Sequence, residues 1–228
     1  MRTRRALLVT GGAPTGNRAR PRVLVLVTGT GTDVGKTWWT AAVARGLRSA
    51  GMRVSARKPV QSGAPGDPTD AAALAAASGE PEDEVTPPHR TLAVPWAPPM
   101  AADELGLPPF TVADLVRETE WHDDVDIGLV EGVGGPRSPL AADGDTVTLA
   151  SALSPDVVVV VGDAGLGAVN AVRLSVGVLA GHPVVVALNR FGAEPLHERN
   201  LASLRGDGLT VVTTPAELVT MLIERTGP

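Results

Sequence analysis

One stretch, residues 23–40, limits what this chain can fold into more than any other. It reads VLVLVTGTGTDVGKTWWT. Its apolar start, Val23–Val27, predicts a strand buried on both faces, as in the centre of a parallel sheet. The glycine-rich loop Gly29–Gly35 predicts backbone amides that can approach a polyphosphate closely. A helix starting at Lys36 and Thr37 would add a positive dipole end, an ammonium and a magnesium-binding hydroxyl, so the stretch predicts a nucleotide site.

A glycine-rich turn that binds no ligand is the alternative for this stretch. The order of buried strand, loop, Gly-Lys-Thr and helix is the order that phosphate binding needs, and it favours the nucleotide site.

Lysine usage points to the same region. Lys36 and Lys58 are the only lysines among 20 basic residues, and every other basic position is arginine. An ammonium is a compact point charge, whereas a guanidinium is a planar fork, and the two do not substitute for each other around phosphate or carbamate oxygens. We therefore expect both lysines to be functional.

The rest of the chain alternates strand-like and helix-like segments. This alternation predicts an α/β fold with a doubly wound, mostly parallel sheet and helices on both faces. The proline-rich segment 87–109 shows little periodicity, and we expect a long ordered loop or lid there. Further strands are expected at residues 54–57, 125–130, 155–161, 183–188 and 209–213. Helices are expected at residues 38–50, 67–78, 111–119 and 215–225, and one more helix follows the segment 163–170 and ends at residue 179.

Charge and composition limit the functional classes. Residues 1–22 contain six arginines and no acidic residue, so the remainder is more acidic than the net charge of −5 suggests. We expect 1–22 to be a disordered basic extension and 23–228 to be a single domain without a nucleic-acid surface. No run approaches the roughly 20 apolar residues of a membrane helix. The absence of cysteine excludes thiol chemistry and suits the cytoplasm.

Polar residues follow several predicted strands, where ligands bind in parallel sheets. Lys58 and Ser62 follow the second strand, and Glu131 with a glycine turn through Gly134 follows the third. Asp70 opens the next predicted helix, where it serves either as a magnesium ligand or as compensation for the helix dipole. Trp96 in the proline-rich segment is either near substrate or a packing anchor.

Together, these motifs resemble the dethiobiotin synthetase family of P-loop NTPases. The resemblance rests on the long loop GTGTDVGKT, on KPVQSG from Lys58, on EGVGG from Glu131, on DAGLGAVN from Asp163 and on a strand-end Asn189. It implies an ATP- and Mg2+-dependent enzyme that converts 7,8-diaminopelargonate and CO2 to dethiobiotin in biotin biosynthesis, through a carbamate and a carbamic-phosphoric anhydride. It also implies a homodimer with the site at the subunit interface.

The resemblance also assigns residues. The catalytic residues would be Thr32, Lys36 and Lys58, and magnesium would be held by Thr37, Asp70 and Glu131. Nucleotide contacts would come from Asp33, Val34, Gly35, Lys36, Thr37, Asp70, Glu131, Gly132, Val133 and Gly134, and on the adenine side from Asn189, Arg190 and Pro215. Substrate contacts would come from Thr32, Lys58, Ser62, Gly167, Ala168 and Asn170, the last three across the interface.

Two departures from the family pattern leave alternatives open. Pro136-Arg137-Ser138 replaces an apolar pair and adds a cation near the expected phosphates, and the region after Arg190 matches poorly. A related ligase acting on another amine therefore stays open. A nucleotide-switched partitioning or metal-delivery ATPase is the other alternative, although such proteins usually carry a second lysine in the loop and Gly29–Val34 has none.

Overall fold

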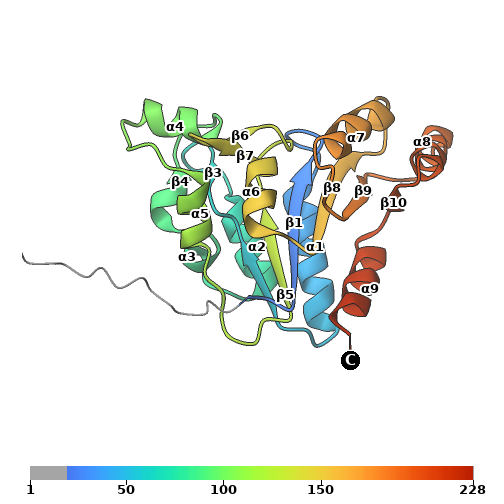
Figure 1. The fold of residues 1–228 in the computed structure, drawn as a ribbon, viewed down its shortest axis with the longest axis horizontal. Helices are drawn as coiled ribbons and strands as arrows, with labels where there is room; N and C mark the ends of the chain where they lie inside the picture. Colours follow the sequence, from blue (N-terminus) through green and yellow to red (C-terminus); the bar gives the residue numbers. More distant parts are fainter. Residues whose placement is uncertain (1–19, 228) are drawn as a thin grey trace, which may run out of the picture.

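A computed structural model describes residues 20–227 of the chain. Its centre is a six-stranded parallel sheet in the order β10-β9-β8-β1-β5-β2 (Figure 1). The predicted doubly wound, mostly parallel α/β fold is therefore confirmed. The strands of this sheet are β1 (Val23–Gly29), β2 (Val54–Arg57), β5 (Ile127–Glu131), β8 (Val157–Asp163), β9 (Val184–Asn189) and β10 (Thr210–Val212).

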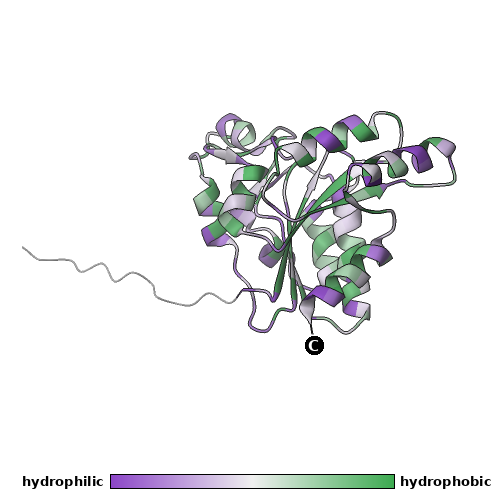
Figure 2. Cartoon of the chain, turned by 45° about the vertical axis from the view of Figure 1, so that its right-hand side comes forward, coloured by the Kyte–Doolittle hydropathy of each residue, from purple (hydrophilic) through white to green (hydrophobic). Residues whose placement is uncertain are grey.

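The central strand β1 is buried along its whole length, as its sequence predicts. Val23, Val25 and Val27 pack into the core on one face, whereas Leu24 and Leu26 pack into the core on the other. Figure 2 shows that hydrophobic residues run along these central strands while hydrophilic residues gather on the outer turns of the helices. Burial on both faces places the loop after β1 in the middle of the sheet edge.

Helices cover both faces of the sheet (Figure 1). One face carries α1, α2, α3 and α9, and the other carries α4 to α8, as the two sets of core clusters show. The helices are α1 (Lys36–Ser49), α2 (Asp70–Ser78), α3 (Glu82–Val85), α4 (Pro98–Glu104), α5 (Val112–Glu118), α6 (Thr146–Leu153), α7 (Ala168–Gly177), α8 (Pro195–Gly206) and α9 (Pro215–Thr226).

The proline-rich segment is more regular than the sequence predicts. Instead of one long loop, residues 87–109 contain a 3-10 turn (Pro88–Arg90), the short strand β4 (Thr91–Leu92) and α4. β4 pairs with β3 (Gln61–Ser62), which follows β2. The prolines begin α4 at its first turn, where a missing N–H costs nothing, and Ala101 and Ala102 are buried. The segment is thus a packed wall of the fold.

Other elements also depart from the predicted boundaries. The helix expected at 67–78 begins at Asp70, because the Thr69 hydroxyl caps it by accepting from the Ala72 amide. The sequence analysis missed α6, α8 and a small hairpin of β6 (Pro139–Ala141) and β7 (Gly144–Asp145).

The amino-terminal side of the domain starts before the predicted boundary at residue 23. Arg20 and Arg22 form ion pairs with Asp156 and Asp126, and the Arg22 amide donates to Val125. The predicted disordered extension otherwise lies outside the described residues. Among the helices of residues 20–227, none has both the length and the apolar character that crossing a membrane requires.

Candidate nucleotide and substrate site

The loop between β1 and α1 needs glycine at two positions, Gly29 and Gly35. A Cβ on Gly29 would lie 2.6 Å from Cγ2 of Val34 and 2.9 Å from the Gly31 carbonyl oxygen. Gly35 has a φ of 92° and makes the sharp entry into α1. Among residues 20–227 no side chain caps α1, so its first amides are available to bind an anion. The Lys36 ammonium folds back and donates to the Gly31 carbonyl at 3.1 Å.

Asn189 and Arg190, at the end of β9, hold this loop in place. The Asn189 side-chain amide donates to the Val34 carbonyl at 2.9 Å, and its oxygen accepts from the Trp39 indole at 3.1 Å. Arg190 donates to the Asp33 carbonyl at 2.9 Å and pairs with Asp163 at 2.6 Å. Asn189 and Arg190 are two of the residues that the family resemblance assigns to the nucleotide. In the structure they hold the loop between β1 and α1 in place.

Lys58 lies at the centre of a charge cluster in which Lys58 and Glu131 are buried and Asp70 reaches the surface. Its ammonium is 2.7 Å from Asp70 Oδ2, 2.8 Å from Glu131 Oε1 and 3.1 Å from the Gly132 carbonyl oxygen. Its side chain is 2% exposed and that of Glu131 is 0% exposed. The three donors of the ammonium thus meet three acceptors, and the sheet order β1-β5-β2 explains why the strand ends converge.

The oxygens of Thr37, Asp70 and Glu131 converge in a way that suits a divalent cation. The Thr37 hydroxyl oxygen lies 2.8 Å from both Asp70 Oδ1 and Glu131 Oε1, although a hydroxyl has one proton to donate. Two carboxylates and a hydroxyl from three separate elements are the hard oxygen donors that Mg2+ prefers. The three residues predicted to bind magnesium are therefore adjacent, and their chemistry fits that ion.

The charges of this cluster shift one another's pKa values. Burial favours neutral Lys58, but the adjacent Glu131 and Asp70 carboxylates outweigh burial and raise the pKa of Lys58. Burial favours protonated Asp70, but the Lys58 ammonium outweighs it and lowers the pKa of Asp70. Burial and then the charge of Lys58 lower the pKa of Lys36. Lys58 is thus held charged.

A cavity of about 630 Å³ opens above this cluster. It brings together many residues predicted from sequence, together with others that the sequence analysis did not assign. The predicted residues lining it are Thr32, Asp33, Gly35, Lys36, Thr37, Lys58, Ser62, Asp70, Val133, Gly134 and Arg190. The additional lining residues are Trp38, Gln61, Pro95, Trp96, Ala97, Pro98, Ser138 and Pro139. For Trp96, which the sequence left open between a place near the substrate and a packing anchor, the structure gives a place in the cavity wall.

Some predicted site residues lie elsewhere. Val34, Glu131, Gly132 and Asn189 sit behind the cavity wall and support it, as the contacts above describe. Gly167, Ala168 and Asn170 are at the start of α7 and, among the described residues, do not belong to the cavity lining of their own chain.

Two polar residues that the sequence analysis missed complete the support of the cluster. The Thr40 hydroxyl donates to Glu131 Oε2 at 2.7 Å, and the Gln61 side chain accepts from the Ala71 amide at 3.0 Å. Thr40 could have been found from its position, one helical turn after Lys36 and on the same face. No sequence signal distinguishes Gln61.

Arg137 does not add the cation that the sequence suggested near the phosphates. It pairs with Asp145 at 2.9 Å and is absent from the described lining of the cavity. Its neighbour Ser138 takes the inward position, and its hydroxyl oxygen accepts from the Gly135 amide at 2.9 Å.

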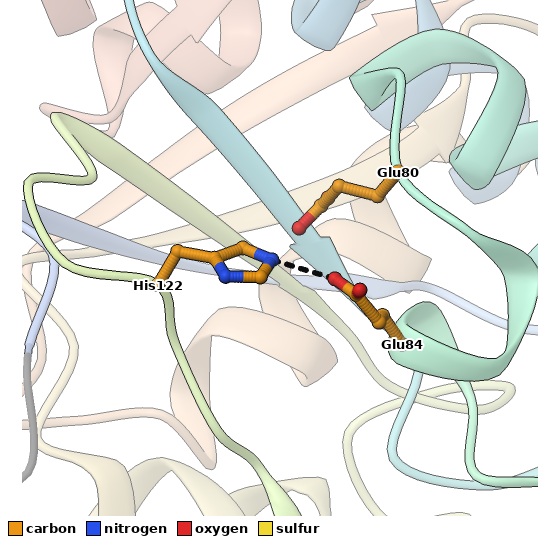
Figure 3. Close-up of side chains that lie close together, drawn as sticks. All are labelled: Glu80, Glu84 and His122. Carbon is orange, nitrogen blue, oxygen red and sulfur yellow. Dashed lines mark hydrogen bonds and ion pairs between the residues drawn. The ribbon is translucent and has the colours of Figure 1, made fainter.

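A second group of titratable side chains, Glu80, Glu84 and His122, lies outside the cavity (Figure 3). The oxygens of Glu80 already accept from the Ser55 hydroxyl, from Arg57 and from the Ala56 amide. His122 and Glu84 are 2.6 Å apart and exposed. Both Glu80 oxygens already accept hydrogen bonds from protein donors, so they are poor candidates for a metal ligand. We assign this group a structural role, in which Glu80 is bound to β2 and His122, before β5, is bound to Glu84 of α3.

Comparisons with known proteins place these features in a family. A family model described as an AAA domain matches residues 24–213. ATP-dependent dethiobiotin synthetase BioD of Rhodococcus jostii is 41% identical over 175 residues, which cover 75% of this chain and 74% of the relative. The protein of the same name from Corynebacterium efficiens is 42% identical over 154 residues, which cover 67% of this chain and 68% of the relative.

Solved structures agree on the fold. The signal recognition particle receptor FtsY from Elizabethkingia anophelis aligns with a TM-score of 0.53 at 15% identity, covering 92% of this chain and 67% of that one. A plasmid partition protein from Borrelia burgdorferi, bound to AMPPNP, aligns with a TM-score of 0.54 at 11% identity, covering 90% and 98%. At such identities these likenesses bear on the fold alone and carry no statement about function.

Proposed function

The chain belongs to the ATP-dependent dethiobiotin synthetase family and is an ATP-dependent ligase of biotin biosynthesis, and we propose that it carboxylates and closes 7,8-diaminopelargonate in the cavity between the phosphate loop and Lys58. The observation that carries this proposal is that Lys36 and Lys58, the two lysines of the chain, both line one cavity. The carboxylates of Asp70 and Glu131 lie beside Lys58. ATP, CO2 and the diamine would give dethiobiotin, ADP and phosphate.

The reaction needs little covalent chemistry from the protein. One amine of the substrate takes up CO2 as a carbamate, the γ-phosphate activates the carbamate as a mixed anhydride, and the second amine closes the cyclic urea with loss of phosphate. Negative charge concentrates where carbamate and triphosphate meet. Positioning and charge neutralisation therefore supply most of the catalysis.

The phosphate loop would bind the triphosphate. The amides of Asp33–Thr37 and the turn Glu131–Gly134 border the cavity or lie just behind its wall. Lys36, which donates to the Gly31 carbonyl, can turn its ammonium to the β- and γ-phosphates because its side chain is flexible. Arg190 would meet the nucleotide beyond the phosphates, and Asn189 would do so from behind the loop.

Thr37, Asp70 and Glu131 would hold Mg2+. The ion, when bound, supplies positive charge to the β- and γ-phosphate oxygens. Glu131 is kept in position by the Thr40 hydroxyl, and Asp70 by its place in the first turn of α2. The convergence of their oxygens on the Thr37 hydroxyl supports this assignment.

Thr32, Lys58 and Ser62 would bind the diamine and its carbamate. Ser62 donates to the Trp96 carbonyl at 2.6 Å, which ties this end of the cavity to the proline-rich segment. The Lys58 ammonium is saturated by Asp70, Glu131 and Gly132, so a carbamate must replace at least one of these acceptors. An ammonium can make this exchange by small rotations because its donors are not fixed in a plane.

We also propose a homodimer formed through α7. The exposed leucines Leu166 and Leu174 are 95% and 66% exposed and lie on or beside this helix. Large apolar side chains left in water at one helix favour a partner surface. In such a dimer Gly167, Ala168 and Asn170 of one subunit would bind the substrate carboxylate in the cavity of the other.

The decisive experiment is product analysis with labelled bicarbonate. The protein is incubated with ATP, Mg2+, 13C-bicarbonate and diaminopelargonate, and dethiobiotin carrying one heavy carbon is expected by mass spectrometry. Matched reactions contain a shorter diamine or no diamine. Incorporation into another diamine alone would favour the related-ligase alternative. ATP hydrolysis without carbon incorporation into any diamine would contradict the proposal and favour an ATPase switch.

A further inference from the structure

Trp38 is a large aromatic residue left half exposed in the wall of the cavity. It immediately follows Thr37 in α1, and 56% of its surface is exposed. A single exposed tryptophan needs no explanation in itself. Trp38 borders a concave site directly after a phosphate-binding motif, so its place relative to a nucleotide would be defined if the phosphates bind at Gly35–Thr37 as proposed.

The indole of Trp38 contacts the neighbouring Trp39. Its ring packs edge-on against Trp39, with centroids 6.1 Å apart and planes at 78°. Trp39 is 1% exposed, and its indole N–H donates to Asn189, which in turn holds the phosphate loop. Trp38 is therefore linked to the phosphate loop through Trp39 and Asn189, while much of its indole stays open to a ligand.

The lining of this cavity also includes a cation. Arg190 lines the same cavity, with its guanidinium tied to Asp163 and to the Asp33 carbonyl. A ligand group that suits both an indole face and a guanidinium is flat, aromatic and equipped with hydrogen-bond acceptors. A nucleobase has these properties, and the aliphatic chain of the diamine does not.

We propose that Trp38 is a specificity-determining residue for the nucleotide and that the base of ATP stacks on its exposed indole. This inference rests on the proposed binding of the triphosphate at Gly35–Thr37. It adds the side chain that would contact the base of the nucleotide. Stacking contributes affinity that depends on the base and not on the phosphates, because every base presents a π-face.

The test compares ATP with inorganic tripolyphosphate, which has the phosphates but no base. Both affinities are measured by calorimetry with Mg2+ for the parent, Trp38→Leu and Trp38→Phe. We expect Trp38→Leu to weaken ATP binding roughly tenfold or more while tripolyphosphate binding stays unchanged. Trp38→Phe should retain most of the ATP affinity because it keeps an aromatic face.

Trp96 offers a matched control, since it is 51% exposed in the same cavity but belongs to the proline-rich segment. Trp96→Phe should leave ATP affinity unchanged. Nucleotide-dependent quenching of tryptophan emission should persist in Trp96→Phe and be lost in Trp38→Phe.

Three outcomes would overturn the proposal. Unchanged ATP affinity in Trp38→Leu would show that the base does not touch the indole. An equal loss for ATP and tripolyphosphate would assign Trp38 to support of the phosphate loop, and a change of oligomeric state would assign it to a subunit contact. Failure of the parent to bind either ligand would instead refute the nucleotide site itself.

Discussion

The Lys58 ammonium lies 2.8 Å from Oε1 of Glu131, and both side chains are shielded from water. Lys58 follows β2 and Glu131 ends the neighbouring strand β5, so the ion pair joins two adjacent strand ends below the cavity. Removing either partner leaves a buried charge uncompensated, which makes truncation a poor probe of function. Substitutions that keep a polar side chain of similar size at these positions are therefore more informative than truncation.

Lys58→Arg should bind ATP with parental affinity but fail to form the urea. A guanidinium keeps the charge, but its planar fork cannot meet Asp70, Glu131 and a carbamate as an ammonium does. ATP affinity, product formation and the melting temperature are measured on one preparation. Product at the parental rate would show that the carbamate role is wrong.

Lys36→Ala should abolish turnover while leaving the fold intact. The lysine neutralises charge that develops during phosphoryl transfer, so its loss should cost on the order of 3 kcal/mol or more in the activation barrier. Circular dichroism checks the fold and single-turnover kinetics check the chemistry. Near-normal turnover in a folded variant would rule out this assignment.

Asp70→Asn and Glu131→Gln should each raise the magnesium concentration required for half-maximal turnover and lower the maximal rate. A neutral amide is a weaker ligand for a hard divalent ion than a carboxylate. Asp83→Asn, which alters an exposed carboxylate on α3, is the control. An unchanged magnesium requirement in Asp70→Asn would leave that residue only its role at the start of α2.

Leu174→Glu should convert the proposed dimer to a monomer, because the substitution places a charge in an apolar contact on α7. Light scattering reports the mass. Met100→Glu alters a residue of similar exposure on α4 and should leave the mass unchanged. A parent protein that is already monomeric would contradict the homodimer proposal.

Glu80→Gln should destabilise the protein by about 3 kcal/mol at neutral pH, because it leaves the buried Arg57 without its carboxylate. Burial favours the protonated form of Glu80, but hydrogen bonds from Ser55, Arg57 and the Ala56 amide outweigh it and lower its pKa. The stabilisation is therefore present above the ordinary pKa of 4.5 and is lost as pH falls through the lower folded value.

Denaturant unfolding at a series of pH values checks this behaviour. The difference in unfolding free energy between the parent and Glu80→Gln should shrink below about pH 4. A difference that stays constant down to acid pH would mean that packing of the side chain, and not its charge, is responsible.

Local sequence determined the central strands, the phosphate loop and most of the strand-end residues of the site. A run such as Val23–Val27 is too apolar for any half-exposed position, and Gly29–Gly35 permits a backbone that other residues exclude. Lys58 and Glu131 could be named because parallel strands bring their carboxyl ends to one edge, whereas Asp70 was named from its place at the start of a predicted helix and from the family resemblance. Short alanine- and proline-rich elements such as α4 escaped notice because their periodicity is weak and only packing stabilises them.

Tertiary structure alone decided how these groups pair. The order of β1, β5 and β2 places Lys58 between Asp70 and Glu131, and sequence spacing contains no information on which strands become neighbours. The same holds for Asn189, which lies 155 positions from Val34 yet braces its loop, and for Trp38, whose exposure beside a buried Trp39 depends on what packs against α1. Periodicity fixes the buried face of an element, whereas contacts between elements arise only when the whole core closes.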